Sequence, residues 1–568
     1  MTTDTHETDR SVPVKAYRLK AKAVWDKQLT WRPRWKEQSQ FMMPSRGKFL
    51  DGYKEEPNRG ERTDEKIING SVLDAIRITG AGLQGGMTSP SRPWFLATLS
   101  DKDLADYAPV KFWLNSVRNI ILSVMAKSNF YTSTHNLYRE LPVFGIGSML
   151  IDSNFQTAIR SRPFTIGEYA IEVDALYRPS ALYRKLYYTA EQMVSKFGIE
   201  NCSEHVKTAY KSNTSKTKYF LVNHVIQPRK GIDLSKADYR GMEFESVYFE
   251  EKGDDTKFLR KGGYRGRPFV APRWNTVGTE VYCDDCPGRS AIGDSKMLQE
   301  MEKDKLLQLK KHNKPPMNAP AKLKEKGGTI ISGGINYIDI LQGQQGFTPA
   351  YQTSPDISQI SVEIQNVEQR IRRMFFNDLF LAILGAGDNK ERTATEIARA
   401  YEEKLIMIGP IIEQLQSEMH DPAIDRIYSI CDEFGLFPPP PPELEGQEIK
   451  IEYLGLLAQA QKLVTTQNIE RTAGYVGSIA QADPRVKYKF NWLQSIEEYA
   501  DANGTPPQLI VPDDVVEQRY QQEQQAVQQA VAQEQISQSA DTAKKLSGVK
   551  IKGKEALDVA ADRAGVEV

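Results

Sequence analysis

The sequence predicts an α+β fold that is predominantly helical and divided into roughly three or four packed units. Three observations support this prediction. The chain has 568 residues, which is more than one hydrophobic core normally organises. Strand-like alternation of apolar and polar residues is concentrated in residues 1–287, whereas helical periodicity dominates the rest. Five consecutive prolines at 438–442 form a stiff spacer before a smaller C-terminal part.

The composition is that of a globular protein and narrows the class of function. Hydrophobic residues make up 40% of the chain and charged residues 26%. No apolar stretch approaches the roughly 18 residues that a membrane-spanning helix needs, so no membrane partner is expected. Lys and Arg together number 74, as do Asp and Glu, so the net charge is zero. Tight static DNA binding normally requires a basic excess and is not expected of the whole chain. The four cysteines fit a reducing, intracellular compartment.

Residues 1–287 are predicted to mix helices with short strands. Residues 63–81 and 106–126 each carry apolar residues near a helical period. The first of these helices is expected to stop at a flexible run of glycines, Gly80, Gly82, Gly85 and Gly86. Residues 144–152 look like a tight turn that enters a buried strand, and residues 219–274 are strand-like and rich in turns.

Two long helices separated by a compact insert are predicted next. The first covers residues 288–313 and ends where Lys314 is followed by two prolines, since proline cannot continue the helical ladder. The second covers residues 356–384 as one helix, with an apolar stripe at positions 360, 364, 367, 371 and 375. The order of helix, insert (314–355) and helix most simply gives an antiparallel pair with the insert as its head.

A loop at 385–392 precedes a third long helix, 393–437, whose first residues fit a capping box. Gly409 and Pro410 lie inside this helix. We expect a kink there, because proline removes one backbone hydrogen bond and clashes with the preceding turn.

The C-terminal part is predicted to be helical and polar. Residues 438–510 are expected to hold a small helical unit from about residue 450 onward. Residues 511–540 form a glutamine-rich helix with a thin apolar stripe, and such a helix is barely stable alone. We expect copies of it to pack side by side in an oligomer. Residues 541–568 have little apolar surface to bury and are expected to form a flexible tail.

The sequence gives no support for enzyme chemistry. A nucleotide-driven motor needs a glycine-rich loop that ends in Gly-Lys-Ser/Thr. Gly-Lys occurs at Gly47 and Gly553, but Phe49 and Glu555 follow the lysines. The six histidines are scattered and suggest no Ser/His/Asp order. We therefore expect neither catalytic activity nor a cofactor.

Cys283 and Cys286 have the spacing of half a zinc site, and Cys202 with His205 could supply the other half. Two aspartates between the first two thiols and a single histidine in the second pair weaken this interpretation. Free thiols near a domain edge are the better interpretation, so no metal site is expected. The sequence leaves open whether the two halves approach each other.

Two groups of residues are candidates for contact with DNA or with an acidic partner. The first is a lysine-rich patch at and beyond the end of the first long helix, made of Lys310, Lys311, Lys314, Lys322, Lys324 and Lys326. The second lies in the 385–392 loop and comprises Asn389, Lys390 and Arg392. Such residues can attract phosphates. A solvated charged surface and an ordinary polar turn explain the two patterns equally well.

The order of elements resembles the head-to-tail connector, or portal, family of short-tailed bacteriophages. Four segments carry this resemblance, namely residues 82–95, 144–152, 288–298 and 391–398. Together with the order of helix, insert, helix, loop and kinked helix, the resemblance covers roughly residues 15–510. The glutamine-rich end departs most from the shared pattern.

The resemblance implies a structural subunit of a dodecameric ring at one capsid vertex, with a wing, stem, clip, crown and C-terminal barrel. The implied parts are the wing (1–287), the stem helices (288–313 and 356–384), the clip (314–355), the tunnel loop (385–392), the long kinked helix (393–437), the crown (438–510), the barrel helix (511–540) and the tail (541–568). The implied partners are double-stranded DNA, the terminase packaging motor, a tail adaptor, and capsid and scaffolding proteins, with internal core proteins as further candidates. The location would be the virion, after assembly in the host cytoplasm.

A ring of this size is compatible with a DNA channel. At about 10 Å between packed helices, twelve copies give a circumference of about 120 Å and about 38 Å between opposite helix axes. Helix thickness leaves an opening of roughly 27 Å, which exceeds the width of a DNA duplex, about 20 Å. Two other interpretations stay open: a different virion structural protein, such as a tail adaptor or internal core protein, and, less favoured, a DNA-processing enzyme.

Overall fold

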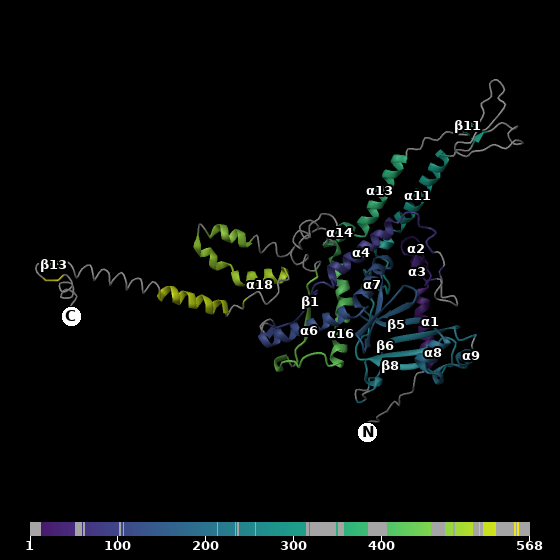
Figure 1. The fold of residues 1–568 in the computed structure, drawn as a ribbon, viewed down its shortest axis with the longest axis horizontal. Helices are drawn as coiled ribbons and strands as arrows, with labels where there is room; N and C mark the ends of the chain where they lie inside the picture. Colours follow the sequence, from purple (N-terminus) through teal and green to yellow (C-terminus); the bar gives the residue numbers. More distant parts are fainter. Residues whose placement is uncertain are drawn as a thin grey trace, which may run out of the picture. The chain divides into compact units, whose positions relative to one another are not determined.

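The computed structural model (Figure 1) divides into two compact units, Met1–Val464 and Thr465–Val568. It describes residues 13–50, 60, 63–101, 104–105, 107–212, 214–232, 235, 238–255, 257–313, 317–318, 348–349, 357–383, 406–444, 446–455, 472–480, 483–503, 511, 515–529, 550–551 and 554–555. Helices and strands are mixed in the first unit, as the predicted α+β class requires.

An antiparallel five-stranded sheet forms one half of the first unit. Its strands follow one another in space as in the sequence: β4 (Tyr169–Val173), β5 (Pro179–Thr189), β6 (Tyr219–Pro228), β7 (Phe244–Glu250) and β8 (Arg260–Tyr264). Helix α1 (Val14–Gln28) packs Val24 and Trp25 against one face. Helices α8 (Ala190–Phe197) and α9 (Glu204–Lys211) cover part of the opposite face. The strand-rich character predicted for residues 219–274 is confirmed.

A second, three-stranded sheet lies at the centre of the first unit, with strand order β3-β2-β9. Its strands are β2 (Ser148–Asn154), β3 (Ala158–Phe164) and β9 (Phe269–Val270). Gly145 ends helix α7 (Phe130–Phe144) with a φ of +75°, a left-handed conformation that favours glycine. The first four residues of β2 are buried. The predicted tight turn into a buried strand is therefore confirmed.

Helix α4 (Ser71–Met87) corrects the prediction of a helix over residues 63–81 that stops at the glycines. The helix begins later and continues through the glycine run. The glycines serve close helix packing: a Cβ added to Gly82 would lie 2.4 Å from side-chain atoms of Phe380, and one on Gly80 would lie 2.6 Å from Cγ of Arg139. Glycine in a helix interior has poor intrinsic propensity, but here tertiary packing outweighs that cost. The predicted helix at 106–126 is confirmed as α6 (Ala108–Lys127).

We predict that Gly82→Ala lowers the free energy of unfolding by about 1–3 kcal/mol, because the added methyl group overpacks against the fully buried Phe380. The matched control is Gly293→Ala. Gly293 is also helical and exposed, and a Cβ there would meet nothing within 4 Å. The control variant should raise the free energy of unfolding by up to about 1 kcal/mol, because alanine has a higher helix propensity than glycine. Urea unfolding of both variants measures the two effects, and equal signs would contradict the packing explanation.

Two helices, α11 (Ile292–Asn313) and α13 (Ile357–Met374), leave the body of the first unit side by side (Figure 1). The pair is antiparallel, because Asp294 near the start of α11 contacts Arg370 near the end of α13. The short strands β10 (Met317–Asn318) and β11 (Thr348–Pro349) pair just beyond the far ends of the helices. The antiparallel arrangement and the end of the first helix before the two prolines are confirmed.

The predicted single helix over 356–384 is wrong, because the chain breaks at Phe375 and Phe376 and resumes as α14 (Asn377–Ile383). Phe376 has a φ of +55°, which a non-glycine residue adopts only when its surroundings impose it. The hydroxyl of Thr79 donates to the carbonyl of Phe375 at 2.8 Å, and Phe375 is fully buried. Tertiary contacts with α4 therefore stabilise a helix break at Phe375 and Phe376 that the apolar stripe in the sequence does not indicate.

The third long helix is described from residue 406 and runs to Glu433. It is helical through Gly409 and Pro410, so a kink at these two residues stays a prediction. The chain departs from α-helical geometry six residues after Pro410, in the π-helical turn η3 (Gln416–His420), before α16 (Asp421–Glu433). The helix ends at Glu433, four residues before the predicted limit at residue 437.

Residues after the five prolines begin with a strand, which corrects the prediction of a helical unit from about residue 450. Strand β12 (Ile449–Tyr453) pairs with β1 (Phe95–Leu99) in an antiparallel two-stranded sheet. The alternation of Ile449, Ile451 and Tyr453 fits a strand, and all three pack against the core of the first unit. In the second unit, residues 472–479, α18 (Trp492–Asn503) and residues 515–529 are helical.

The remaining described elements complete the first unit around these parts. They are helices α2 (Arg32–Met42), α3 (Pro44–Gly47) and α10 (Pro287–Ser290), and the short 3₁₀ turns η1 (Ile199–Asn201), η2 (Tyr239–Gly241) and η4 (Pro442–Leu444). The second unit adds the 3₁₀ turn η5 (Pro484–Lys489) and the two-stranded β13 (Lys550–Ile551) and β14 (Lys554–Glu555).

Candidate functional site

Most residues that the sequence singled out as contact sites lie outside the described part of the chain. This applies to Lys314, Lys322, Lys324, Lys326, Asn389, Lys390 and Arg392. Lys310 and Lys311 are exposed in the last turn of α11. In the long helix, Gly409 is buried and Pro410 is exposed. The placement of the two predicted contact groups relative to each other lies outside the described residues, and their roles stay predictions.

Among the described residues, the buried contacts between α11 and α13 lie near the base of the pair. Leu298 of α11 packs in one cluster with Ile364, Val367 and Ile371 of α13, and each is at most 4% exposed. Asp294 accepts from the guanidinium of Arg370 at 3.2 Å. The buried residues of α11 are confined to Ser295, Leu298 and Gln299. Beyond this level, the far half of α11 has no buried residue.

A polar clasp fixes the base of the pair to the segment before α4. The side-chain oxygen of Gln299 accepts from the backbone amides of Ile68 (2.6 Å) and Asn69 (2.8 Å). The side-chain amide of Asn69 donates to the carboxylate of Glu302 on α11 at 3.0 Å and to that of Glu368 on α13 at 2.8 Å. One short segment thus binds both helices, and it sets the direction in which the pair leaves the body.

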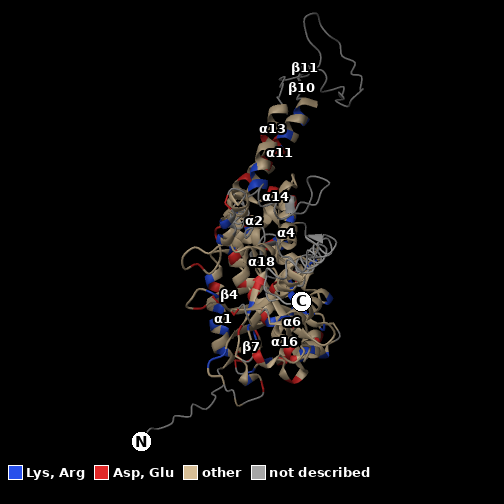
Figure 2. Ribbon diagram, turned by 90° about the vertical axis from the view of Figure 1, so that its left-hand side faces the viewer, with Lys and Arg blue, Asp and Glu red and all other residues tan. Residues whose placement is uncertain are grey.

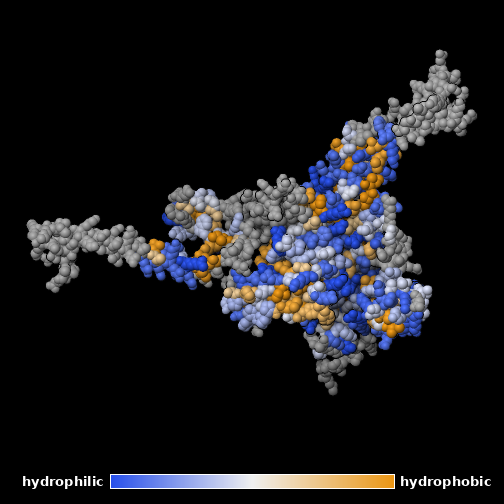
Figure 3. Space-filling view, viewed as in Figure 1, coloured by the Kyte–Doolittle hydropathy of each residue, from blue (hydrophilic) through white to orange (hydrophobic). Residues whose placement is uncertain are grey.

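The outer surface of the pair combines half-exposed apolar side chains with locally paired charges. The exposed fractions of Leu306, Leu307 and Val362 are 45%, 47% and 54%. Lys303 pairs with Glu300 at 3.7 Å on the same helix face. Hydrophobic and hydrophilic residues share the surface of α11 and α13 in Figure 3, and both signs of charge occur along the pair in Figure 2. The surface is therefore neither strongly basic nor fully polar.

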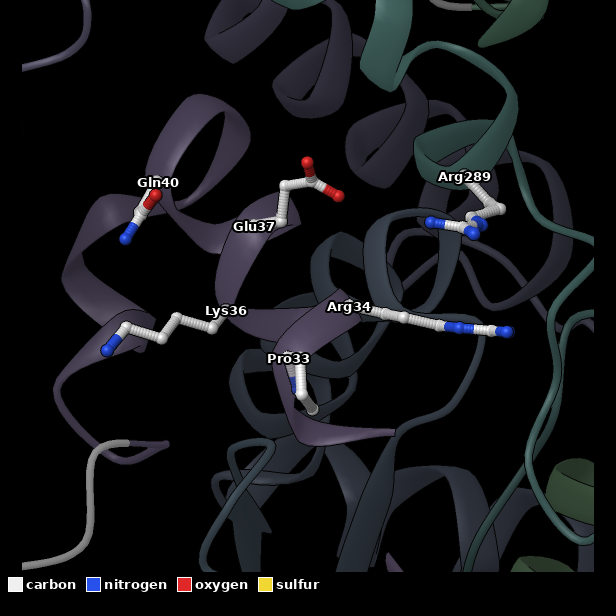
Figure 4. Close-up of a pocket in the computed structure, with 6 residues that line it drawn as sticks. All are labelled: Pro33, Arg34, Lys36, Glu37, Gln40 and Arg289. Atoms are coloured by element: carbon white, nitrogen blue, oxygen red, sulfur yellow. The ribbon is translucent and has the colours of Figure 1, made fainter. Parts of the chain in front are cut away.

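A shallow hollow of about 460 Å³ lies between α2 and α10, close to the start of α11 (Figure 4). Arg34 and Arg289 lie on one side of it, and Lys36 and Gln40 on the other. Asp284 accepts from Arg34 at 2.8 Å and lies 3.3 Å from Nε of Arg289. Glu37 pairs with Lys296. These charges are satisfied within the chain, so the hollow presents no evident ligand site.

The long helix is anchored by buried polar contacts at its π turn. The carboxylate of Glu418 accepts a hydrogen bond from the backbone amide of Arg273 at 2.9 Å. Both carboxylate oxygens of Glu418 also lie 3.1 Å from Nε of Arg273. The side chains of Arg273 and Glu418 are only 3% and 6% exposed. Arg273 also donates to the carbonyl of Tyr177 at 2.7 Å. This bidentate ion pair ties the helix to the strand-rich core.

His420 occupies the end of the same turn and is neutral. Its Nε2 lies 2.8 Å from the hydroxyl of Tyr138, which also accepts from Thr88 at 3.3 Å. Tyr138 and His420 therefore share one hydrogen bond, whose direction depends on the imidazole tautomer. Burial lowers the pKa of His420 to about 3, because the charged imidazolium would lose its hydration. Trp94 and Tyr453 surround the ring.

The cysteine pairs are not brought together. Cys202 packs in a hydrophobic cluster with Met193 and Val206, whereas Cys283 and Cys286 belong to another cluster. Burial raises the pKa of both Cys202 and Cys283 to about 11. Within the described ranges, no three His, Cys, Asp or Glu side chains gather as metal ligands would. The thiols act as small apolar side chains in separate cores.

Sequence reasoning missed the buried polar groups that fix the helices, namely the Gln299–Asn69 clasp and the Arg273–Glu418 pair. The residues of each pair lie far apart in the sequence, so no local spacing pattern predicts that they contact each other. Residues 416–421 read QSEMHD, so the neighbours of Glu418 in the sequence are mostly polar and do not mark it as a buried charge. Among the residues described, no helix is long and apolar enough to cross a membrane.

Comparison with known proteins places the chain in a family. The family described as bacteriophage head to tail connecting protein matches residues 14–511. A probable portal protein of Bordetella phage BPP-1 is 36% identical over 531 residues, which cover 93% of this chain and 94% of that protein. The portal protein of Salmonella phage epsilon15 is 35% identical over 531 residues, which cover 94% and 95%.

A solved structure, the neck of an empty GTA particle, covers 78% of this chain at 10% identity with a TM-score of 0.32, too low to support an argument. The two sequence relatives and the family match extend over nearly the whole chain. The chain therefore belongs to the bacteriophage head to tail connecting proteins, the portal family.

Proposed function

We propose that copies of this chain form the portal ring at one vertex of a phage capsid, and that DNA passes through the ring during packaging and ejection. The observation that carries the proposal is the helix pair α11–α13, which leaves the body while burying only its base. Membership of the portal family supports the same conclusion.

The exposed apolar side chains of the pair favour contact between copies. Leu306, Leu307 and Val362 lie on a two-helix projection, and no other described element of the chain buries them. An exposed apolar surface rimmed by charge is typical of an interaction site. In a ring, the same projection of the next copy supplies the missing layer, since a closed ring repeats one heterologous contact.

The size of the pair suits a channel wall. The 22 residues of α11 span roughly 33 Å. Twelve such projections at about 10 Å spacing enclose an opening of roughly 27 Å, whereas six would leave less than about 10 Å. A dodecamer therefore admits duplex DNA and a hexamer does not.

The charge pattern of α11 is suited to a channel wall that lets DNA pass without binding it tightly. Each neutralised phosphate adds to affinity through counterion release and would add to the barrier for sliding. On α11, Lys303 and Lys305 are paired with Glu300 and Glu302. The zero net charge of the chain points in the same direction. We infer that the wall is electrostatically nearly neutral toward the DNA backbone.

The family also suggests partners for the ring. These are the terminase packaging motor and later a tail adaptor at the clip, capsid and scaffolding proteins around the wing, and internal core proteins at the C-terminal helices. The location would be the virion, after assembly in the host cytoplasm. Lys310 and Lys311, exposed at the clip end of α11, are the members of the lysine-rich patch that the structure describes.

Negative-stain electron microscopy of the purified protein tests the proposal. The expected result is a large ring with an open centre wide enough for duplex DNA. A compact monomer under every assembly condition would contradict the proposal, and so would rings with a closed centre.

We further predict that replacing Lys390 and Arg392 together with alanine leaves ring assembly intact and alters DNA retention. Both residues belong to the proposed tunnel loop, where few cations can contact passing phosphates transiently. The measurement is the fraction of filled capsids that keep their DNA over time, with Glu391→Ala as the control in the same loop. Unchanged packaging and retention would rule out this role of the loop.

A further inference from the structure

A row of polar and basic side chains crosses the middle of the five-stranded sheet. Arg184 on β5 pairs with His224 on β6, His224 pairs with Tyr248 on β7, and Tyr248 pairs with Arg260 on β8. Directly paired residues of neighbouring strands share one face of a sheet. The row separates two apolar clusters on that face, one around Ile226 and the other around Val222.

The central three-stranded sheet contributes the opposite side of this region. The guanidinium carbon of Arg184 lies 3.6 Å from the ring centre of Phe164 on β3. Arg162 lies two residues before Phe164 on the same side of β3, and its side chain is 45% exposed. Asp152 of β2 is already engaged, since Tyr264 donates to it at 3.0 Å and Arg162 lies 3.4 Å from it.

Arg184 is the unusual member, because it is a buried cation that forms no ion pair among the described residues, although the charge of Glu168 acts on it from a distance. It is 7% exposed, and none of the ion pairs found among the described residues includes it. Its Nη1 lies 3.5 Å from Nδ1 of His224, whose Nε2 lies 2.9 Å from the hydroxyl of Ser246. This chain of contacts requires a neutral His224 that accepts from Arg184 and donates to Ser246.

The environment keeps His224 neutral and makes the region electropositive. Burial lowers the pKa of His224, and the nearby cations Arg184 and Lys196 lower it further. Burial likewise lowers the pKa of Arg184. An unpaired buried guanidinium is costly, so a bound anion would remove a real penalty.

Lys196 of α8 extends the region at the rim. Its ammonium group donates to the hydroxyl of Tyr188 at 2.7 Å and lies 5.2 Å from the ring centre of Tyr248. Burial raises the pKa of Tyr248 to about 12, so its hydroxyl keeps the proton and can donate. Lys196 and Arg260 are exposed and have no carboxylate partner in the described ranges.

Charge balance identifies the class of ligand. Arg162, Arg184, Lys196 and Arg260 are the cations of the region, which we name the basic row, and Asp152 and Glu168 are the carboxylates that act on it. Asp152 is engaged by Arg162, and Glu168 accepts from the backbone amide of Thr165 at 3.1 Å. The remaining excess is about two positive charges. A phosphate monoester or inorganic phosphate carries a charge of about −1.5 to −2, so it neutralises this excess better than a single carboxylate does.

We propose that the basic row binds a phosphate dianion, with Arg184 at its base, Arg162, Arg260 and Lys196 at its rim, and the hydroxyl of Tyr248 as a neutral donor. Planar guanidinium groups match the oxygens of phosphate in charge and geometry. The bound ion joins the two sheets and α8.

Isothermal titration of the full chain with inorganic phosphate at constant ionic strength tests the proposal, with chloride as the reference anion. Arg260→Gln and Lys196→Gln should each weaken phosphate binding by about tenfold to a hundredfold, since each removes a hydrogen bond to a charged group. The matched control is Lys261→Gln. Lys261 is adjacent to Arg260 but pairs with Val247 on the other face of the sheet, so this variant should bind within about twofold of the parent.

Adenosine monophosphate and adenosine distinguish the sources of the phosphate. Binding of inorganic phosphate alone would identify a site for the free ion, and binding of the monophosphate but not of the nucleoside would identify a site for a carried phosphate group. The proposal is overturned if phosphate binds no better than chloride, or if Arg260→Gln binds as the parent does. A third result would also overturn it: a glutamate peptide binds and the Arg260→Gln and Lys196→Gln variants weaken that binding, while phosphate does not bind. That result would assign the basic row to an acidic protein segment.

Discussion

Glu418→Ala is expected to lower the free energy of unfolding of the first unit by about 3–5 kcal/mol, which is the usual cost of removing one partner of a buried ion pair. The reason is the isolation of Arg273. Its side chain is 3% exposed, and Glu418 is its carboxylate partner. Without that carboxylate the guanidinium stays buried and unpaired. Urea unfolding followed by tryptophan fluorescence measures the effect.

Two further variants separate the buried charge from loss of packing. Arg273→Met combined with Glu418→Leu should recover most of the lost stability, because removing both charges avoids the unpaired guanidinium. Glu300→Ala is the matched surface control. Glu300 is 70% exposed and pairs with Lys303 at 3.7 Å, so its loss should change stability by less than about 0.5 kcal/mol. A double variant as unstable as Glu418→Ala would show that the buried charge is not the cause.

Replacing Leu306 and Leu307 together with aspartate is expected to abolish ring assembly while the monomer stays folded. The two side chains are 45% and 47% exposed in the single chain, so aspartate is tolerated there. In the proposed ring they are covered by the next copy, and burying an unpaired carboxylate at that contact is strongly unfavourable. Size-exclusion chromatography with light scattering gives the oligomeric state, and circular dichroism gives the folded state of the monomer.

Leu298→Asp is the contrasting variant on the same helix. Leu298 is fully buried against Ile364, Val367 and Ile371, so its replacement should lower the thermal transition of the monomer itself. Rings formed normally by the Leu306/Leu307 variant would show that this surface does not join copies. A monomer unfolded by that variant would assign both leucines to the fold.

Local signals in the sequence identified several of the helices and strands. The end of α11 follows from the two prolines, and the entry into β2 follows from Gly145, whose positive φ suits glycine. The alternation over residues 219–274 correctly indicated strands. Family membership also followed from the sequence: four segments in order carried the resemblance, and the family match and two relatives extend over nearly the whole chain.

Local signals failed where distant residues decide the conformation. The glycines of α4 were expected to end a helix, yet Phe380 and Arg139 pack against them and keep the helix intact. The apolar stripe of residues 356–384 continues through Phe375, yet Thr79 of α4 stabilises a break there. Strand β12 needed β1, some 350 residues earlier, as its partner.

The sequence by itself determined the class of fold, the antiparallel helix pair and the family, because periodicity, breakers and the order of motifs are local or linear properties. The tertiary structure alone decided where helices break, which charges are buried in pairs and which stay unpaired. The physical reason is that a helix or a buried charge responds to the free energy of its whole surroundings. Arg184 shows this most clearly: only the strand register brings it beside His224 and in line with Tyr248 and Arg260.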